Sequence, residues 1–353
     1  MQKTPLFLAA LLASTAALAQ QKTLKDSYKD YFPVGVAVAP RNLSGPEAEF
    51  IVKQFNSITP ENAMKMGPIH PEPGRYAWEA PDAIVAFAKK NGMKVRGHTL
   101  CWHNQTPSWF FIDAAGAQVT REVLLERLKQ HITDVVGRYK GQIYAWDVVN
   151  EAVPDTGTGI YRASKFYEII GEDYIEKAFE YAHAADPAAK LFYNDYNTES
   201  PAKREKIFQL VKKLKEKNAP IHGVGLQGHW SVYEPSESEL QESISRFAGL
   251  GLAVQVTELD VSVHVKEHGR RERTEADNAP VPAEAFTRQA AQYEMLFNTF
   301  RKNRGALTGV TFWNVSDKTT WLDNFPVRGR KDYPLLFDEE LQPKPFFNKI
   351  VDF

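Results

Sequence analysis

The sequence predicts an α/β protein built as a single (β/α)8 TIM barrel, with its active site at the C-terminal ends of the strands. Eight short apolar segments have the β-branched composition of buried strands, and amphipathic helical patterns separate them. About 330 residues remain after the N-terminal leader, which is enough for one large core of this type. Strands and helices that alternate eight times imply a closed parallel sheet.

The expected strands and helices cover the whole chain after the leader. The strands are Val34–Pro40, Ser57–Glu61, Lys94–Leu100, Ala145–Glu151, Lys190–Asp195, Gly223–His229, Ala253–Asp260 and Gly309–Val315. The helices between them include Ala80–Asn91, Arg121–Tyr139, Tyr167–Ala185, Ala202–Asn218, Ser236–Leu250 and Pro282–Lys302. Ser236 stands three positions before Glu239, which is the pattern of a capping box at a helix start. No linker, repeat or second domain interrupts this alternation.

Residues 1–19 have the pattern of a secretory signal peptide, so we expect one domain over residues 20–353. Lys3 supplies a positive start, Leu6–Leu12 an apolar stretch, and Ala17–Ala19 the small residues before a cleavage site. The apolar stretch is too short to span a bilayer permanently, and we expect no membrane contact of the mature form. We therefore predict an exported protein, either periplasmic or extracellular.

The amino-acid composition of the chain indicates which kinds of molecule it can bind. The chain has 43 basic and 44 acidic residues, and the basic residues are dispersed, which argues against a nucleic-acid partner. Aromatic residues make up 12% of the chain, which fits sugar binding because the apolar face of a pyranose stacks on a ring. Cys101 is the only cysteine, so no intramolecular disulfide can form, and we expect a buried inert thiol. We expect a monomer without a cofactor.

Two glutamates stand where predicted strands end. Glu151 closes the run that begins at Tyr144, and Glu258 lies near the end of the run that begins at Ala253. In a parallel barrel this end of the strands is the face that carries the chemistry. Two carboxylates facing each other are the minimum requirement for hydrolysing a glycosidic bond. Asn150, directly before Glu151, strengthens the functional interpretation because it adds an amide at the same strand end.

Amides, imidazoles, a lysine and indoles follow the other predicted strands. These strand ends are Thr59–Lys65, Arg96–Gln105, Tyr193–Asn197, Gln227–Trp230 and Phe312–Asp317, which Trp321 follows. Only one face of the barrel can collect all of them. Hydrogen-bonding groups together with stacking rings match the recognition of a polyol.

The chain resembles a family 10 glycoside hydrolase, an endo-β-1,4-xylanase. The matching motifs, in chain order from about residue 28 to residue 353, are Glu61-Asn62-Ala63-Met64-Lys65, Arg96-Gly97-His98-Thr99-Leu100 with Trp102-His103, Trp146-Asp147-Val148-Val149-Asn150-Glu151-Ala152, Gln227-Gly228-His229, Thr257-Glu258-Leu259-Asp260 and Pro343-Lys344-Pro345. The resemblance implies a barrel whose acid/base and nucleophile lie on strands four and seven. The strand pattern places the two glutamates on the same strands.

Carried over to this sequence, the resemblance makes Glu151 the acid/base and Glu258 the nucleophile. Retention of configuration needs carboxyl groups about 5–5.5 Å apart, so that one attacks the anomeric carbon while the other protonates the leaving oxygen. The negative charge of Glu258 would help to keep Glu151 protonated. Asn150 would bind the sugar 2-hydroxyl, and Asp260 would orient His229, which would bond to Glu258.

The resemblance also implies the substrate and the residues that bind it. The substrate would be xylan and xylo-oligosaccharides. The expected substrate-binding residues are Glu61, Asn62, Lys65, His98, Trp102, Gln105, Gln227, Trp313 and Trp321. Asn194 and Tyr196 are weaker candidates for the leaving-group side. Asn314 departs from the family, which usually has glycine there, and its side chain is expected to crowd the loop beside Trp313.

Two other functions remain possible on the same barrel. An endo-β-1,4-glucanase would share the chemistry, and the closure around the cleavage point by Trp313, Trp321 and Gln105 would decide between them. A non-catalytic glycan-binding protein is disfavoured because both Glu151 and Glu258 are present. No His/Asp spacing makes a convincing metal site, although a structural Ca²⁺ stays open. The charged segment Lys266–Pro280 is interpreted as a solvated loop without chemistry.

Overall fold

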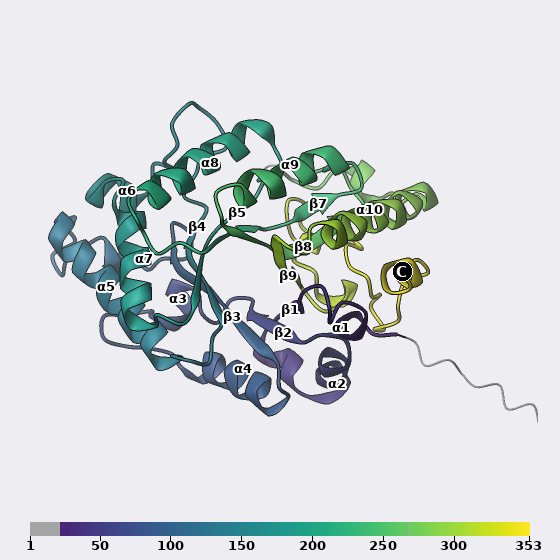
Figure 1. Ribbon diagram of the computed structural model, residues 1–353, viewed down its shortest axis with the longest axis horizontal. Helices are drawn as coiled ribbons and strands as arrows, with labels where there is room; N and C mark the ends of the chain where they lie inside the picture. The colour runs from purple at the N-terminus through teal and green to yellow at the C-terminus, as the bar shows by residue number, and fades with distance from the viewer. Residues whose placement is uncertain (1–21, 268) are drawn as a thin grey trace, which may run out of the picture.

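The computed structural model describes residues 22–267 and 269–353, and at its centre is a closed barrel of parallel strands (Figure 1). The strands are β1 Val34–Val38, β2 Ser57–Pro60, β3 Lys94–Trp102, β4 Ala145–Asn150, β5 Lys190–Asp195, β6 Gly223–Leu226, β7 His229–Ser231, β8 Ala253–Ser262 and β9 Leu307–Phe312. Strands β1 to β6 pair in sequence order, β6 pairs with β8, and β9 joins β8 to β1. The predicted TIM barrel is confirmed. The expected signal peptide lies outside the described residues.

Helices connect the strands and surround the barrel (Figure 1). The α-helices are α1 Leu24–Ser27, α2 Gly45–Gln54, α3 Met66–Ile69, α4 Glu79–Lys90, α5 Arg121–Arg138, α6 Lys165–Ile170, α7 Tyr174–Ala185, α8 Pro201–Glu216, α9 Glu237–Ala248, α10 Ala283–Lys302 and α11 Phe347–Val351. Short 3-10 helices are η1 Pro40–Leu43, η2 Ser108–Phe110, η3 Glu275–Asn278, η4 Asp317–Thr319 and η5 Trp321–Asp323. The capping box predicted at Ser236 is present. Over the described part of the chain, every helix is too short or too polar to cross a membrane.

The sixth predicted strand is divided in two. Gly228 has a φ of 83°, which is in the left-handed region that favours glycine, and it separates β6 from β7. A Cβ at this position would lie 2.8 Å from Cγ1 of Val256. After the break, β7 pairs with β8 alone, and His229 stands opposite Asp260. The break at Gly228 therefore places His229 next to β8, the strand that carries Glu258.

The predicted helix Tyr167–Ala185 is also divided. Gly171 has a φ of 95° and ends α6, and α7 begins at Tyr174. Strand β8 runs two residues beyond the predicted end at Asp260, so Glu258 lies farther inside the strand than predicted.

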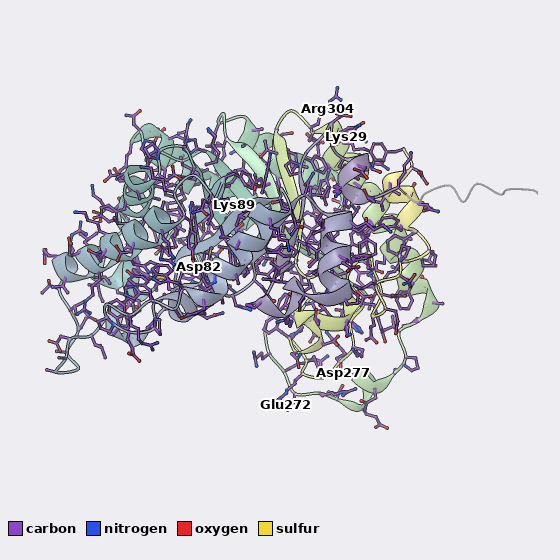
Figure 2. The ribbon with its side chains drawn as sticks, turned by 90° about the horizontal axis from the view of Figure 1, so that it is seen from below. Lys29, Asp82, Lys89, Glu272, Asp277 and Arg304 are labelled. Carbon is purple, nitrogen blue, oxygen red and sulfur yellow. The ribbon has the colours of Figure 1, made fainter. Side chains whose placement is uncertain are left out.

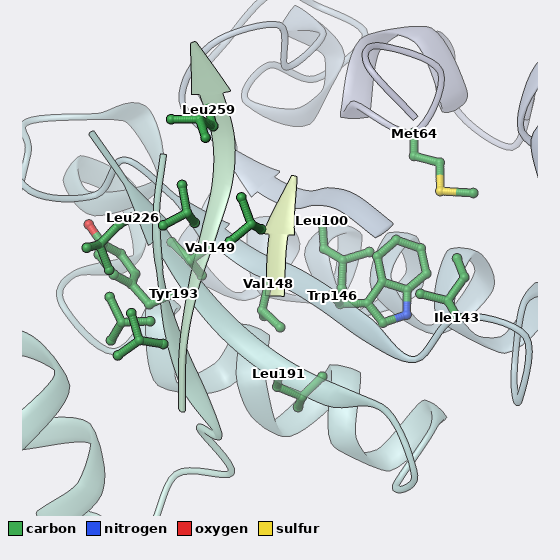
Figure 3. Packing of buried hydrophobic residues seen from close by; sticks show 14 of the residues in the cluster. Met64, Leu100, Ile143, Trp146, Val148, Val149, Leu191, Tyr193, Leu226 and Leu259 are labelled. Atoms are coloured by element: carbon green, nitrogen blue, oxygen red, sulfur yellow. The ribbon is translucent and has the colours of Figure 1, made fainter. Parts of the chain in front are cut away.

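Apolar side chains fill the space around the strands. Figure 3 shows Leu100, Trp146, Val148 and Leu191 within the packed cluster, and all four are fully buried. Gly97 on β3 makes room for the indole, because a Cβ there would lie 2.1 Å from the ring of Trp146. Burial of such side chains is the main favourable contribution to folding.

A charged pair lies inside the barrel below the strand ends. The guanidinium of Arg96 on β3 donates two hydrogen bonds to Asp147 on β4, and the two residues are 1% and 0% exposed. Arg96 Nε also donates to Oε1 of Gln255 on β8 at 2.9 Å. Nδ1 of His98 lies 2.9 Å from Asp147 Oδ2. Asp147 therefore connects the barrel interior to His98, a predicted site residue.

We expect Asp147→Asn to lower the free energy of unfolding by about 3–5 kcal/mol, because it leaves the buried charge of Arg96 without a counter-ion. Asp82→Asn is the control: Asp82 pairs with Arg138 at the surface, where the side chains are 42% and 39% exposed, and it should cost at most about 1 kcal/mol. Urea unfolding of the parent and both variants measures the difference. Equal losses in the two variants would contradict the assignment of Asp147 to the barrel's charged centre.

Candidate active site

Glu151 follows the last residue of β4 in a constrained backbone conformation. Its φ is 58°, in the left-handed region that non-glycine residues rarely adopt. Its backbone N–H donates to the carbonyl of Asn194 at 2.9 Å, and Nε of Arg162 donates to its own carbonyl at 2.8 Å. Such conformations persist where surrounding contacts hold them, and they concentrate at functional sites.

The carboxyl group of Glu151 accepts hydrogen bonds on both oxygens. Nε1 of Trp102 donates to Oε2 at 2.9 Å, and Nε2 of Gln227 donates to Oε1 at 2.9 Å. The donors come from the ends of β3 and β6, so three strand ends fix the carboxyl group. Trp102 and Gln227, both predicted as site residues, therefore lie at the acid/base candidate.

Glu258 lies on β8, and its carboxylate is buried. Nδ2 of Asn194 donates to Oε1 at 2.8 Å, and Nε2 of His229 lies 3.1 Å from Oε2. The other imidazole nitrogen, Nδ1, lies 2.9 Å from Oδ2 of Asp260, which also accepts a hydrogen bond from Nε1 of Trp321 at 2.8 Å. The predicted series Glu258, His229 and Asp260 is brought together, and it extends to Trp321.

His229 carries both ring protons. Burial would lower its pKa, but the charges and hydrogen bonds of Asp260 and Glu258 outweigh burial and raise the pKa to about 10. The imidazolium therefore donates from Nδ1 to Asp260 and from Nε2 to Glu258. A fixed positive charge beside Glu258 favours its ionised form.

Three neutral amides link the two catalytic carboxyl candidates. Nδ2 of Asn194 donates to both Glu258 and Oδ1 of Asn150, the latter at 2.8 Å. Nε2 of Gln227 donates to the same Asn150 oxygen at 3.4 Å and to Glu151. The amides fix the separation of the two groups without adding a charge between them.

The pKa values of the two glutamates shift in opposite directions. Burial raises the pKa of Glu151, the negative charge of Asp195 raises it further, and Glu258 adds a smaller contribution. Burial would also raise the pKa of Glu258, but the hydrogen bond from His229 and nearby positive groups, including Lys65, lower it to about 2. The shifts thus favour the protonated form of Glu151 and the ionised form of Glu258, which is the arrangement an acid and a nucleophile require.

Lys65 and two indoles form a wall beside these carboxylates. Nζ of Lys65 donates to Oδ1 of Asn62 at 2.9 Å and lies 5.1 Å and 5.9 Å from the ring centres of Trp102 and Trp313. Burial lowers the pKa of Lys65, while Glu258 and other nearby carboxylates oppose the shift. The ring of Trp313 also lies 5.3 Å from that of His98.

Glu61 and Gln105 lie farther from the reacting groups. Glu61 is paired with Arg41, with Nη2 and Oε2 3.2 Å apart. Gln105 is exposed, and its backbone carbonyl accepts a hydrogen bond from Gly67 at 2.7 Å. Within the described residues neither side chain contacts a catalytic carboxylate. Both remain at the mouth of the barrel, beyond the second and third strands.

Asn194 contacts more of the site than the sequence predicts, and Asp195 and Arg162 are site residues that the sequence does not predict. Asn194 and Asp195 are at the end of β5, and the polar run Tyr193–Asn197 was the available signal. Lys203 Nζ pairs with Asp195 at 2.8 Å. Arg162 lies in the connection between β4 and α6, where nothing in the sequence marks it as a contact of Glu151.

Asn314, the predicted departure, occupies a position suited to glycine. Its φ is 137°, and the residue is only 3% exposed. Its Oδ1 has no hydrogen-bond partner among the described residues. The added side chain is therefore accommodated next to Trp313 at a cost in backbone strain. Whether it changes the pose of Trp313 stays a prediction.

The structure describes no group of three or more His, Cys, Asp or Glu side chains suited to a metal ion in residues 22–267 and 269–353. Polar side chains at the site instead make hydrogen bonds to the carboxyl groups of Glu151 and Glu258. These residues can protonate a leaving group and present a nucleophile, which requires no metal.

Asp195→Asn should lower the pKa of Glu151 more than Glu258→Gln does, because Asp195 is the larger source of negative charge. NMR titration of the ¹³C-labelled glutamate carboxyl measures both shifts. Asp186→Asn, which removes another buried carboxylate outside the site, should leave the value unchanged. An unchanged or raised pKa in Asp195→Asn would contradict the electrostatic assignment.

Comparison with known proteins agrees with this geometry. The profile described as Glycosyl hydrolase family 10 matches residues 23–353. Endo-1,4-beta-xylanase B of Paenibacillus barcinonensis is 52% identical over 93% of this chain and 97% of its own. Beta-1,4-xylanase of Dictyoglomus thermophilum is 54% identical over 94% and 91%.

A solved structure extends the similarity to three dimensions. Xylanase XynB from Paenibacillus barcinonensis, complexed with a conduramine derivative, has a TM-score of 0.90 and 51% identity over 94% of this chain and 99% of that chain. The resemblance drawn from the motifs is confirmed. The chain belongs to glycosyl hydrolase family 10.

Proposed function

We propose that the chain is an endo-1,4-β-xylanase that cleaves internal bonds of xylan and xylo-oligosaccharides with retention of configuration. One observation carries the proposal: two carboxyl groups at the barrel mouth have oppositely shifted pKa values and are joined by neutral amides. The xylanases related to this chain, at 52% and 54% identity, support the choice of substrate.

In the first step the ionised carboxylate of Glu258 attacks the anomeric carbon. Glu151 gives its proton to the glycosidic oxygen as the bond to the leaving chain breaks. The imidazolium of His229 keeps Glu258 ionised until the attack, and Asn150 is positioned to bind the sugar 2-hydroxyl. A covalent glycosyl-enzyme results, and the negative charge of Glu258 is lost.

In the second step water replaces the departed chain. Glu151, now ionised, takes a proton from the water while the oxygen of the water attacks the anomeric carbon. The bond between the anomeric carbon and Glu258 breaks, and Glu258 leaves as a carboxylate. The pKa of Glu151 is lower in the glycosyl-enzyme because the opposing charge of Glu258 is absent. The site returns to its starting protonation state.

The aromatic residues favour xylose over glucose at the cleavage point. The ring of Trp321 is fixed by its bond to Asp260 and by stacking on Phe325 at 5.3 Å between ring centres. Trp313 is buried beside His98 and His229. Indoles held in this way leave little freedom to admit the hydroxymethyl group that glucose carries and xylose lacks.

Residues 1–19 would be removed as a signal peptide, and residues 20–353 would form the catalytic domain of a monomer. The enzyme would act in the periplasm or the medium, where polymeric xylan is accessible. Formation of the active site within one barrel is consistent with activity as a monomer.

Glu258→Ala should abolish hydrolysis, and azide should restore turnover with inverted product because it attacks from the face that the carboxylate leaves open. Glu151→Ala should lose activity on poor leaving groups and retain it on activated aryl glycosides, which need little protonation. Rates against leaving-group pKa, with and without azide, separate the roles. Identical responses of the two variants would show that the roles are assigned wrongly.

The parent should cleave aryl β-xylobioside faster than aryl β-cellobioside, by a factor on the order of 10–200 in kcat/KM. Trp321→Ala should reduce this preference most, and Trp321→Phe, which keeps a ring stacked on Phe325 but loses the bond to Asp260, should reduce it less. Comparable parent rates on both substrates would favour the glucanase alternative. An unchanged preference in Trp321→Ala would contradict only the role of this indole.

A further inference from the structure

The segment between β8 and α10 projects from the end of the barrel that carries the active site. Figure 2 shows Glu272 and Asp277 at this projecting end, and Lys29 and Arg304 at the opposite end of the molecule. The described residues of the segment are mostly exposed, as expected of a solvated loop, and they also make specific contacts with neighbouring chain.

Backbone pairing attaches the segment to the chain that follows Trp321. Arg271 forms a parallel bridge with Val327, and its N–H donates to the carbonyl of Pro326 at 3.3 Å. The two segments therefore lie side by side beside the substrate-binding indole.

Charge pairing fixes the same contact. Arg271 pairs with Glu267 at 2.5 Å and with Asp277 at 2.7 Å. Arg330, from the second segment, pairs with the same two carboxylates at 2.7 Å and 3.4 Å. These four charges compensate one another, so they hold the two segments together and leave no net charge for binding a ligand.

Three other arginines of these segments have no such partner. Arg270, Arg273 and Arg328, which we call the arginine rim, are exposed, and no carboxylate among residues 22–267 and 269–353 lies within ion-pair distance of them. Nη1 of Arg273 packs against Gly329, where an added Cβ would lie 3.2 Å away. The three charges are therefore carried on adjacent stretches of chain and remain available.

The rim is connected to the cleavage point through two rings. Arg270 lies 5.8 Å from the ring centre of Phe325, and Phe325 stacks on Trp321. Trp321 in turn bonds to Asp260, the partner of His229. These contacts place Arg270 on the side of the site that Trp321 forms, where a group attached to a sugar near the cleavage point would meet its guanidinium.

We propose that the arginine rim binds the carboxylate of a uronic-acid branch on the xylan backbone. The inference rests on the proposed xylanase function and adds a preference for acidic decoration. Guanidinium groups bind carboxylates through paired, charge-assisted hydrogen bonds. Glu272 and Glu275 of the same segment have no described cationic partner, and their negative charges weaken the attraction of the arginine rim for a carboxylate. The contribution of the rim to binding is therefore limited to that of exposed charge pairs.

The test compares two oligosaccharides with the same xylose backbone, one linear and one with a single uronic-acid branch. The triple variant Arg270→Gln, Arg273→Gln and Arg328→Gln should lower kcat/KM on the branched substrate by about threefold to tenfold relative to the linear one. Arg304→Gln, an exposed arginine at the opposite end of the barrel, should leave the ratio unchanged. Salt near 1 M should reduce the parent's ratio towards that of the triple variant.

The outcomes separate this proposal from the proposed function. A parent that cleaves linear xylan, and a triple variant with an unchanged ratio, would overturn the arginine rim and leave the xylanase assignment intact. A parent inactive on both substrates would overturn the xylanase assignment and the rim with it. Equal losses on both substrates in the triple variant would also reject the rim, because they would show a general structural effect.

Discussion

The active site depends on a protonated imidazole between two buried carboxylates. His229 lies 2.9 Å from Asp260 and 3.1 Å from Glu258, and its pKa is raised to about 10. Its charge compensates the burial of two anions that would otherwise be strongly unfavourable in the barrel. Burial, the charge of Asp195 and, to a smaller extent, the charge of Glu258 favour the protonated form of Glu151. Trp321 bonds to the same Asp260 oxygen, so the wall of the substrate site depends on this interaction as well.

The rest of the site keeps the two glutamates electrostatically distinct while fixing them in one frame. Neutral amides join them, so the frame carries no charge that would shift both pKa values in the same direction. The charge that raises the pKa of Glu151 comes chiefly from Asp195 on β5, and the cation that lowers that of Glu258 comes from β7. Below them, Arg96 and Asp147 form a compensated pair that anchors His98. Asp195 on β5 and His229 on β7 thus shift the two pKa values from different strand ends.

Strand pattern alone located Glu151 and Glu258, because buried strands of a parallel barrel end on one face. The roles of Asn150, His229 and Asp260 followed from the resemblance, and the contacts bring those residues together as expected. Asn194 was ranked too low because its role depends on reaching Asn150 and Glu258 at once, which only the barrel register determines. Arg162 was missed because the path of a connecting loop has no periodic signal. The break at Gly228 was missed because the segment Gly223–His229 contains two earlier apolar residues spaced as in a strand, and Gly228 was included in that strand.

The protonation state of His229 can be measured directly. We expect ¹⁵N NMR of the ring to show both nitrogens protonated from pH 6 to pH 8, because the pKa is about 10. In Asp260→Asn the pKa should fall towards the ordinary value near 6.5, since the larger of the two supporting charges is gone. A parent imidazole that titrates near 6.5, or that holds a single proton throughout this range, would contradict the claim that His229 keeps Glu258 ionised.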